Sequence, residues 1–196
     1  MGEIKSAWEL AMERTAGIES DKSSLRMSEL KKAGGRIASA YMDGEKPEPK
    51  KLTKEFKNYS GKELETVRKA SVEILLSYIS LPRDEDFQDK IDFVSEGLKA
   101  VFGKGAPVKD ILQQVSQFFS QFLQHRQQIT EQLKEQYTPQ LRRKQQSISK
   151  QYGYQVDLKH EQDPEFNALL KQNLQQLEAQ YQEALNQVKD QLRAYV

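Results

Sequence analysis

Apolar residues recur at helical intervals along most of the second half of the chain. One row begins at Val108 and reaches Tyr152, with members mostly separated by three, four or seven positions. Spacing of this kind places apolar side chains on one face of an α-helix. A second row has spacings close to a heptad repeat and comprises Phe166, Leu170, Leu174, Leu177, Tyr181, Leu185, Val188, Leu192 and Tyr195. The two rows predict two long amphipathic helices.

Both rows can be buried by laying one helix against the other. Residues 153–163 form a polar connection, and Asp163 followed by Pro164 is a favourable helix start, because Asp is a good N-cap and Pro fits the first helical position. Pro139 lies inside the first row, where we expect a kink rather than an end because the stripe resumes beyond it. The pattern predicts a long antiparallel, coiled-coil-like hairpin over residues 107–196. Pairing with a second copy of the chain is the alternative way to cover the rows.

Two shorter helices are expected near the N-terminus. A helical pattern over residues 3–16 is interrupted at Gly17, and Ser20 and Asp21 are placed to cap a second helix that runs to about Met42. Gly34 and Gly35 lie inside the second helix, where each glycine lowers helix stability by about 1 kcal/mol relative to alanine. A close contact with another helix, or a kink, would explain why glycine occupies these positions.

A charged stretch divides the chain into segments. Residues 43–51 contain two prolines and six charged residues, so we expect no helix there. The predicted fold is all-α, a helical bundle with a long antiparallel C-terminal helical hairpin. Its expected organisation is a set of N-terminal helices over 1–46, a charged linker over 47–59, a two-helix segment over 60–104 and the hairpin over 107–196.

Capping residues mark where the two helices of segment 60–104 are expected to begin. Ser60 and Glu63 form a capping-box pattern, in which each side chain accepts a hydrogen bond from the other residue's backbone N–H. Asp84 is placed to cap the second helix. The apolar rows that follow these residues support both helix assignments.

Composition indicates a thin hydrophobic core. Hydrophobic residues make up 37% of the chain, charged residues make up 30%, and the mean hydropathy is -0.80, whereas an ordinary globular domain is roughly 45–50% apolar. The formal net charge is +1, from 30 Lys+Arg and 29 Asp+Glu. A nearly neutral chain has no long-range field that attracts a polyanion, which argues against nucleic acid as the partner.

One basic cluster keeps a nucleic-acid alternative open. Its members are Arg142, Arg143, Lys144 and Lys150. On a helix the first three spread over about 200° of the circumference, so they form no single stripe, and a solvated helix face is the favoured interpretation. The alternative function is a nucleic-acid-associated helical protein that uses residues 142–150.

Residue types that carry catalysis are sparse. The chain has no cysteine, which excludes thiolate catalysis and cysteine-ligated metal sites. His125 has glutamines as its helical neighbours, and His160 lies beside Glu161 and Asp163, but a metal site needs three or four converging ligands. Neither phosphate-binding glycine motif is present. We therefore expect no metal, no cofactor and no enzymatic activity.

The expected environment of the chain is the cytoplasm. No stretch approaches the roughly 18 consecutive apolar residues of a membrane-spanning helix, and the first residues lack the apolar core of a signal peptide. We therefore expect no membrane partner.

The expected function is binding rather than catalysis. Large apolar side chains anchor many protein interfaces, and the candidate docking residues are Trp8, Met12, Phe118, Phe119 and Phe122. Trp8 has an alternative role in packing its own helix into the core. We expect a structural or interaction protein, such as a scaffold, an adaptor or a chaperone-like protein, whose partner is another protein or a second copy of the chain.

Overall fold

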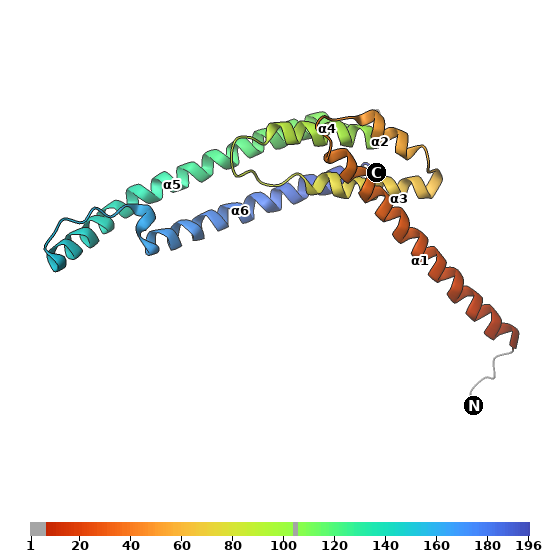
Figure 1. The fold of residues 1–196 in the computed structure, drawn as a ribbon, viewed down its shortest axis with the longest axis horizontal. Helices are drawn as coiled ribbons and strands as arrows, with labels where there is room; N and C mark the ends of the chain where they lie inside the picture. The colour runs from red at the N-terminus through yellow and green to blue at the C-terminus, as the bar shows by residue number, and fades with distance from the viewer. Residues whose placement is uncertain (1–6, 104–105) are drawn as a thin grey trace. The chain divides into compact units, whose positions relative to one another are not determined.

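The structure, a computed structural model, describes residues 7–103 and 106–196, with side chains from residue 22 onward. Within these ranges the chain forms six α-helices, one short 3-10 helix and no strand (Figure 1). The predicted all-α fold class is therefore confirmed. The helices are α1 (Ala7–Met42), α2 (Pro49–Phe56), α3 (Gly61–Ser77), α4 (Gln88–Phe102), α5 (Val108–Tyr152) and α6 (Pro164–Arg193), with the 3-10 helix η1 (His160–Gln162) before α6.

The helices belong to two compact units. The first unit takes in the described residues up to Ile79, together with Lys90–Lys109 and Gln191–Val196. The second unit consists of Ser80–Asp89 and Asp110–Asp190. Helices α1 to α3 and most of α4 therefore lie in the first unit, and most of α5 and α6 lies in the second.

Helices α1 and α3 of the first unit touch through a glycine. A Cβ atom at Gly34 would lie 2.3 Å from the carbonyl oxygen of Val67 and 2.8 Å from Cβ of Ala70, so only glycine allows this approach. The Ser71 hydroxyl, which is fully buried, lies 2.9 Å from the carbonyl oxygens of both Gly34 and Val67. A Cβ at Gly35 would meet its nearest neighbour only at 3.8 Å. The close helix contact expected at this glycine pair is confirmed, and Gly34 is the residue that makes it.

Tyr41, in the last turn of α1, joins that helix to α4. Its hydroxyl donates a hydrogen bond of 2.9 Å to the carbonyl oxygen of Phe93, and the two rings meet edge to face at 5.0 Å. Burial, with a smaller contribution from Glu96, raises the pKa of Tyr41 to about 12. A Cβ at Gly97 would lie 2.7 Å from the Tyr41 ring. The absence of a side chain at Gly97 therefore makes room for the buried tyrosine.

The last residues of the chain also pack within the first unit. Arg193 forms a two-pronged ion pair with Glu73 of α3, with distances of 2.7 Å from Nε to Oε1 and 2.9 Å from Nη2 to Oε2. The rings of Tyr195 and Phe102 lie 6.1 Å apart. These contacts join the end of α6 to α3 and α4, which are far away in sequence.

One expected break between helices is wrong, and a second is shorter than expected. Helix α1 continues through Gly17 for 36 residues, because a single glycine weakens a helix by about 1 kcal/mol without ending it. Residues 43–51 are not free of helix, since α2 begins at Pro49, the helical position that proline fits best. Leu52 and Phe56 are 2% and 4% exposed, so packing of one face stabilises this short charged helix.

The helix starts expected in segment 60–104 are only partly correct. Ser60 is the N-cap of α3, but its side chain makes no capping hydrogen bond. Glu63 instead forms an ion pair with Arg26 of α1, 2.9 Å from Nε to Oε1. The next helix begins at Gln88 rather than directly after Asp84, whose carboxylate accepts a backbone hydrogen bond in the turn before the helix. The capping-box prediction and the Asp84 cap are therefore wrong.

Helix α5 is the longest element of the described chain. It runs for 45 residues with Pro139 in its interior, which corresponds to about 68 Å at 1.5 Å per residue. We expected the helix to continue past the proline, and it does. The kink expected at Pro139 stays a prediction. It ends before Gly153, which adopts a positive φ of 76°. No helix in the described ranges is both long enough and apolar enough to cross a membrane.

Helix α6 begins as the sequence predicts. Pro164 is its first residue, and the carboxylate of Asp163 accepts a hydrogen bond of 3.0 Å from the backbone N–H of Glu165. This bond satisfies one of the free N–H groups at the start of the helix. Asp163 therefore holds the N-cap position expected for it.

Candidate functional site

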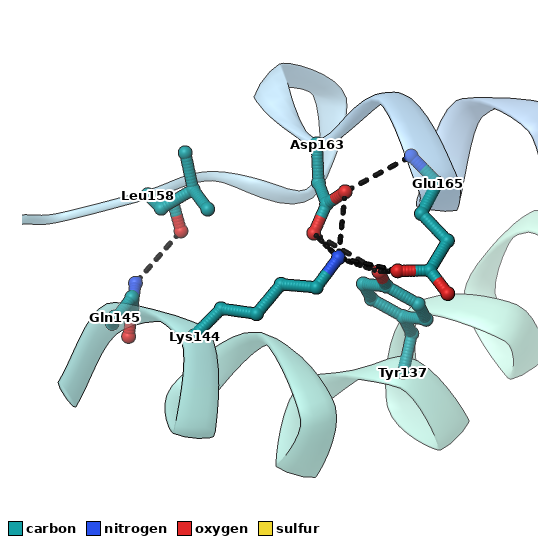
Figure 2. A network of polar contacts seen from close by, with 6 residues as sticks. All are labelled: Tyr137, Lys144, Gln145, Leu158, Asp163 and Glu165. Carbon is teal, nitrogen blue, oxygen red and sulfur yellow. Dashed lines mark hydrogen bonds and ion pairs between the residues drawn. The ribbon is translucent and has the colours of Figure 1, made fainter. Parts of the chain in front are cut away.

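A cluster of four polar side chains lies where α6 begins beside α5 (Figure 2). We call Tyr137, Lys144, Asp163 and Glu165 the polar cluster. Lys144 extends from α5, and its ammonium group donates to the Tyr137 hydroxyl at 2.7 Å, to Asp163 Oδ2 at 2.8 Å and to Glu165 Oε2 at 2.6 Å. An ammonium group has three N–H bonds, so each of them has an acceptor in the cluster.

Asp163 is the most buried charged residue of the cluster. Only 3% of its surface is exposed, and besides the ammonium of Lys144 it accepts a hydrogen bond of 2.9 Å from the Tyr137 hydroxyl. The hydrogen bond from Lys144 holds the pKa of Asp163 below its usual value. The same bond, with those to Glu165 and Tyr137, raises the pKa of Lys144. The buried carboxylate is thus paired and hydrogen-bonded, which a buried charge requires.

An apolar layer supports the polar cluster. The Tyr137 ring lies 5.5 Å from the ring of Phe166, which is fully buried. Leu141 joins them in one buried group, and Leu133, Leu158 and Leu170 pack against it. Burial raises the pKa of the Tyr137 hydroxyl, with Asp163 adding to the effect. Tyr137 therefore joins the apolar layer to the polar cluster above it.

His160 lies next to the place where Pro139 interrupts the hydrogen bonds of α5. Pro139 has no N–H group to donate to the carbonyl oxygen of Glu135, and His160 makes its contacts one residue earlier, at Lys134. There the carbonyl oxygen of Lys134 accepts from the Thr138 hydroxyl at 2.7 Å and lies 3.1 Å from Nε2 of His160. Nε2 of His160 also lies 3.1 Å from the Thr138 hydroxyl, so the ring makes two polar contacts with this turn of α5. Lys134 also pairs with Glu161 at 2.6 Å, which fixes η1 against α5.

A second group of contacts joins α5 and α6 around Tyr181. Its ring lies 4.6 Å from the ring of Phe118 and 5.1 Å from that of Phe122, and its hydroxyl lies 2.7 Å from Nδ1 of His125. Phe119 packs edge to face against Phe87 at 5.5 Å. His125 and His160 therefore both make polar contacts where other segments meet α5.

The structure separates the five candidate docking residues. Phe119 and Phe122 are only 1% and 2% exposed, so the chain itself covers them, whereas Phe118 is half-buried. Trp8 and Met12 lie on α1, but their side chains fall outside the part of the chain whose side chains are described. Of the three phenylalanines, only Phe118 presents surface to a partner without a rearrangement of the helices.

The basic cluster does not act as one surface. Arg142, Arg143 and Lys150 are exposed, as a nucleic-acid contact requires. Lys144 is instead directed to Asp163 and Glu165, and these two carboxylates offset its charge. Only the other three residues remain as candidate basic contacts.

The contacts of the polar cluster hold the start of α6 to α5. The raised pKa of Lys144 keeps its amine protonated at neutral pH, and a protonated amine is neither a base nor a nucleophile. In the described ranges, no three side chains of His, Asp or Glu gather closely enough to hold a metal ion. The geometry therefore supports a positioning role for the cluster.

The Asp163→Asn variant should be less stable than the wild type at neutral pH, by about 1–2 kcal/mol, since it loses charge-assisted hydrogen bonds but keeps a good N-cap. A carboxylate whose pKa is lowered by folding contributes stability that is present above its unfolded pKa and is lost as the pH falls. The difference between the two proteins should therefore shrink below about pH 4.

Thermal melts followed by circular dichroism between about pH 7 and pH 2 measure this difference. Asp157→Asn, at an exposed position of the connection before α6, is the matched control and should melt like the wild type. A difference between Asp163→Asn and wild type that stays constant down to the lowest pH would contradict the role given to the ion pair.

No curated protein and no solved structure matches this chain. Residues 53–194 match the sequence model of a family described as a family of unknown function, DUF6657. The match extends from within α2 to the end of α6, so it covers the polar cluster and the contacts around Tyr181. Because these residues make up well over half of the chain, the protein belongs to this family of unknown function, DUF6657.

Proposed function

We propose that this protein is a non-enzymatic structural or interaction protein whose α5 and α6 form a long antiparallel, coiled-coil-like hairpin. The order of the contacts between the two helices supports the hairpin. Phe118, early in α5, meets Tyr181, late in α6, whereas Tyr137, late in α5, meets Phe166, early in α6. Residue numbers thus rise along one helix while those of their partners fall along the other.

The outer faces of this hairpin are the surface we propose for partner binding. Exposed residues of α5 and α6 are largely glutamine and charged side chains, such as Gln124, Gln127 and Gln128. Long paired helices with polar outer faces present an extended, rigid surface. Because such a surface is already ordered, binding a partner costs little conformational entropy. Such a surface suits a scaffold, an adaptor or a chaperone-like protein, and fold alone cannot choose between them.

We further propose that the partner is another protein or a second copy of the chain, and that binding takes place in the cytoplasm. Half-buried Phe118 is the candidate anchor on the hairpin, since aromatic side chains dominate many interfaces. It lies beside Tyr181, so a partner could add to an aromatic group that already exists.

Reconstitution with purified components tests the proposal. The tagged chain is used to capture partners from its native cell, and each captured protein is then purified and mixed with the chain in sedimentation velocity runs. We expect a complex of fixed stoichiometry, or a defined oligomer of the chain alone, that is weakened by Phe118→Ala. A chain that stays monomeric and forms no defined complex with any captured protein would contradict the proposal.

A nucleic-acid-associated protein is the alternative function. The exposed positions of Arg142, Arg143 and Lys150 favour it, while the net charge of +1 does not. Fluorescence anisotropy with single- and double-stranded oligonucleotides at low salt distinguishes the two functions. Binding that falls steeply with salt and is lost in the Arg142→Glu/Arg143→Glu variant would support the alternative, and no binding at low salt would exclude it.

A further inference from the structure

A groove lies between the C-terminal part of α1 and α2 in the first unit. Its volume is about 550 Å³, within the range of roughly 300–1,000 Å³ that is typical of ligand pockets. The connection between the two helices and Tyr59 complete its lining. We call this feature the α1–α2 groove, and it is separate from the α5–α6 surface described above.

The floor of the α1–α2 groove is apolar and partly open to solvent. It is formed by Ala33, Ile37, Ala40 and Leu52. Leu52 is buried, Ala33 and Ile37 are half-buried, and Ala40 is exposed. Small side chains on α1 therefore leave room above Leu52 for an apolar side chain of a ligand.

The rim of the groove carries an excess of positive charge. It has four basic residues, which are Arg36, Lys46, Lys51 and Lys54, and two acidic residues, which are Glu48 and Glu55. Lys51 is paired with Glu48 at 2.7 Å. Within the described part of the chain, the other three basic residues form no ion pair, and Glu55 is the remaining acidic residue of the groove lining. An occupant of the groove would therefore gain from carrying negative charge.

We propose that the α1–α2 groove binds an acidic, amphipathic segment of a partner protein. An apolar side chain of that segment would lie on the floor, and its carboxylates would lie against Arg36, Lys46 and Lys54. An apolar floor suits a peptide side chain better than a phosphate backbone, and a cationic rim selects acidic peptides over basic ones. This inference does not depend on the function proposed for α5 and α6.

The test uses the full-length chain and a fluorescein-labelled peptide of about 12 residues that carries leucines at helical spacing and glutamates elsewhere. Fluorescence anisotropy should show saturable binding that weakens as salt is raised, because screening reduces attraction between exposed charges. A matched peptide with lysine in place of glutamate should bind at least about tenfold more weakly.

Variants assign the binding to the groove. Lys46→Glu/Lys54→Glu should weaken binding of the glutamate peptide at least about tenfold, because it reverses two rim charges. The control Lys50→Glu/Lys57→Glu makes the same charge change at exposed positions outside the groove and should stay within roughly twofold of wild type. Ala40→Trp should also abolish binding without changing the charge, since the indole would fill the floor. Circular dichroism melts establish that all variants are folded.

Five results would overturn the proposal, and the first four concern the peptides and the variants. They are no saturable binding by the wild type, equal binding of the lysine peptide, equal loss in both charge-reversal variants, and unchanged affinity of Ala40→Trp. Competition by a single-stranded oligonucleotide at lower concentration than the peptide would also overturn it, because it would assign the groove to nucleic acid.

Discussion

Gly34→Ala should destabilise the first unit by about 3 kcal/mol. The new Cβ would lie 2.3 Å from a backbone carbonyl of α3, a distance that no side-chain movement can relieve, so α1 and α3 must separate. Overpacking of this kind costs typically 1–3 kcal/mol and occasionally more. The separation would also weaken the hydrogen bond from buried Ser71. These losses exceed the gain of about 1 kcal/mol that alanine brings to a helix.

Gly35→Ala is the matched control, at the next position of the same helix. Its Cβ would meet only a flexible side-chain atom at an ordinary distance of 3.8 Å. Stability should therefore be unchanged or higher by up to about 1 kcal/mol. Urea unfolding gives the free energy of unfolding of both variants, provided that their m-values equal that of the wild type. Equal stability of the two alanine variants would contradict the close approach of α1 to α3.

Phe166→Ala should have the largest effect in the second unit, about 3–5 kcal/mol. The ring is fully buried and contacts both Tyr137 and His160. Its removal leaves a cavity directly below the polar cluster and frees the Tyr137 ring from its support. We therefore expect the start of α6 to open locally as well as the unit to become less stable.

Leu169→Ala provides the comparison, because Leu169 lies one turn later on α6 but is 37% exposed. It should cost less than about 1 kcal/mol. Denaturant unfolding gives the stability of both variants, and native-state hydrogen exchange reports on local opening. Faster exchange of amides near Asp163 in Phe166→Ala alone is the expected result. Equal costs for the two variants would show that Phe166 does not hold α6 to α5.

Features determined by local sequence could be predicted well. The start of α6 follows from Asp163 and Pro164, and the end of α5 follows from Gly153, because capping and positive φ depend on a few neighbouring residues. The pair Gly34 and Gly35 indicated either a close helix contact or a kink, because glycine in a helix needs an explanation; which of the two applies, and which glycine makes the contact, did not follow from the sequence. The partner helix at that contact could not be predicted, since it depends on the tertiary fold.

Features determined by tertiary contacts were missed. Helix α2 is highly charged and short, and what stabilises it is the burial of Leu52 and Phe56 against the rest of the first unit. Glu63 fits a capping pattern, yet Arg26, 37 positions earlier, forms an ion pair with it. Local rules could not anticipate either outcome, because both depend on which helices become neighbours.

The polar cluster could have been found from helical geometry. Tyr137, Leu141 and Lys144 are spaced by four and three residues, so they share one face of α5. Grouping Lys144 with Arg142 and Arg143 followed adjacency in sequence instead of position on the helix. A lysine on the apolar face needs a buried acceptor, and the N-cap Asp163 supplies it.

The antiparallel pairing of α5 and α6 is tested most directly by distances between spin labels. The chain has no cysteine, so labels can be attached at Gln128→Cys and Gln172→Cys, both exposed and nearly opposite in the proposed pairing. Packed helix axes lie about 8–10 Å apart. The comparison pair is Gln114→Cys with Gln172→Cys. Its α5 label lies on nearly the same side of the helix as a label at Gln128, but about 21 Å further along it.

An antiparallel hairpin within one chain predicts a short, narrow distance for the first pair and a clearly longer one for the second. Both distances should persist in an excess of unlabelled chain. The proposed hairpin would be contradicted if the distance between labels at positions 128 and 172 were no shorter than that between labels at positions 114 and 172. A short distance that disappears on dilution with unlabelled chain would also contradict it.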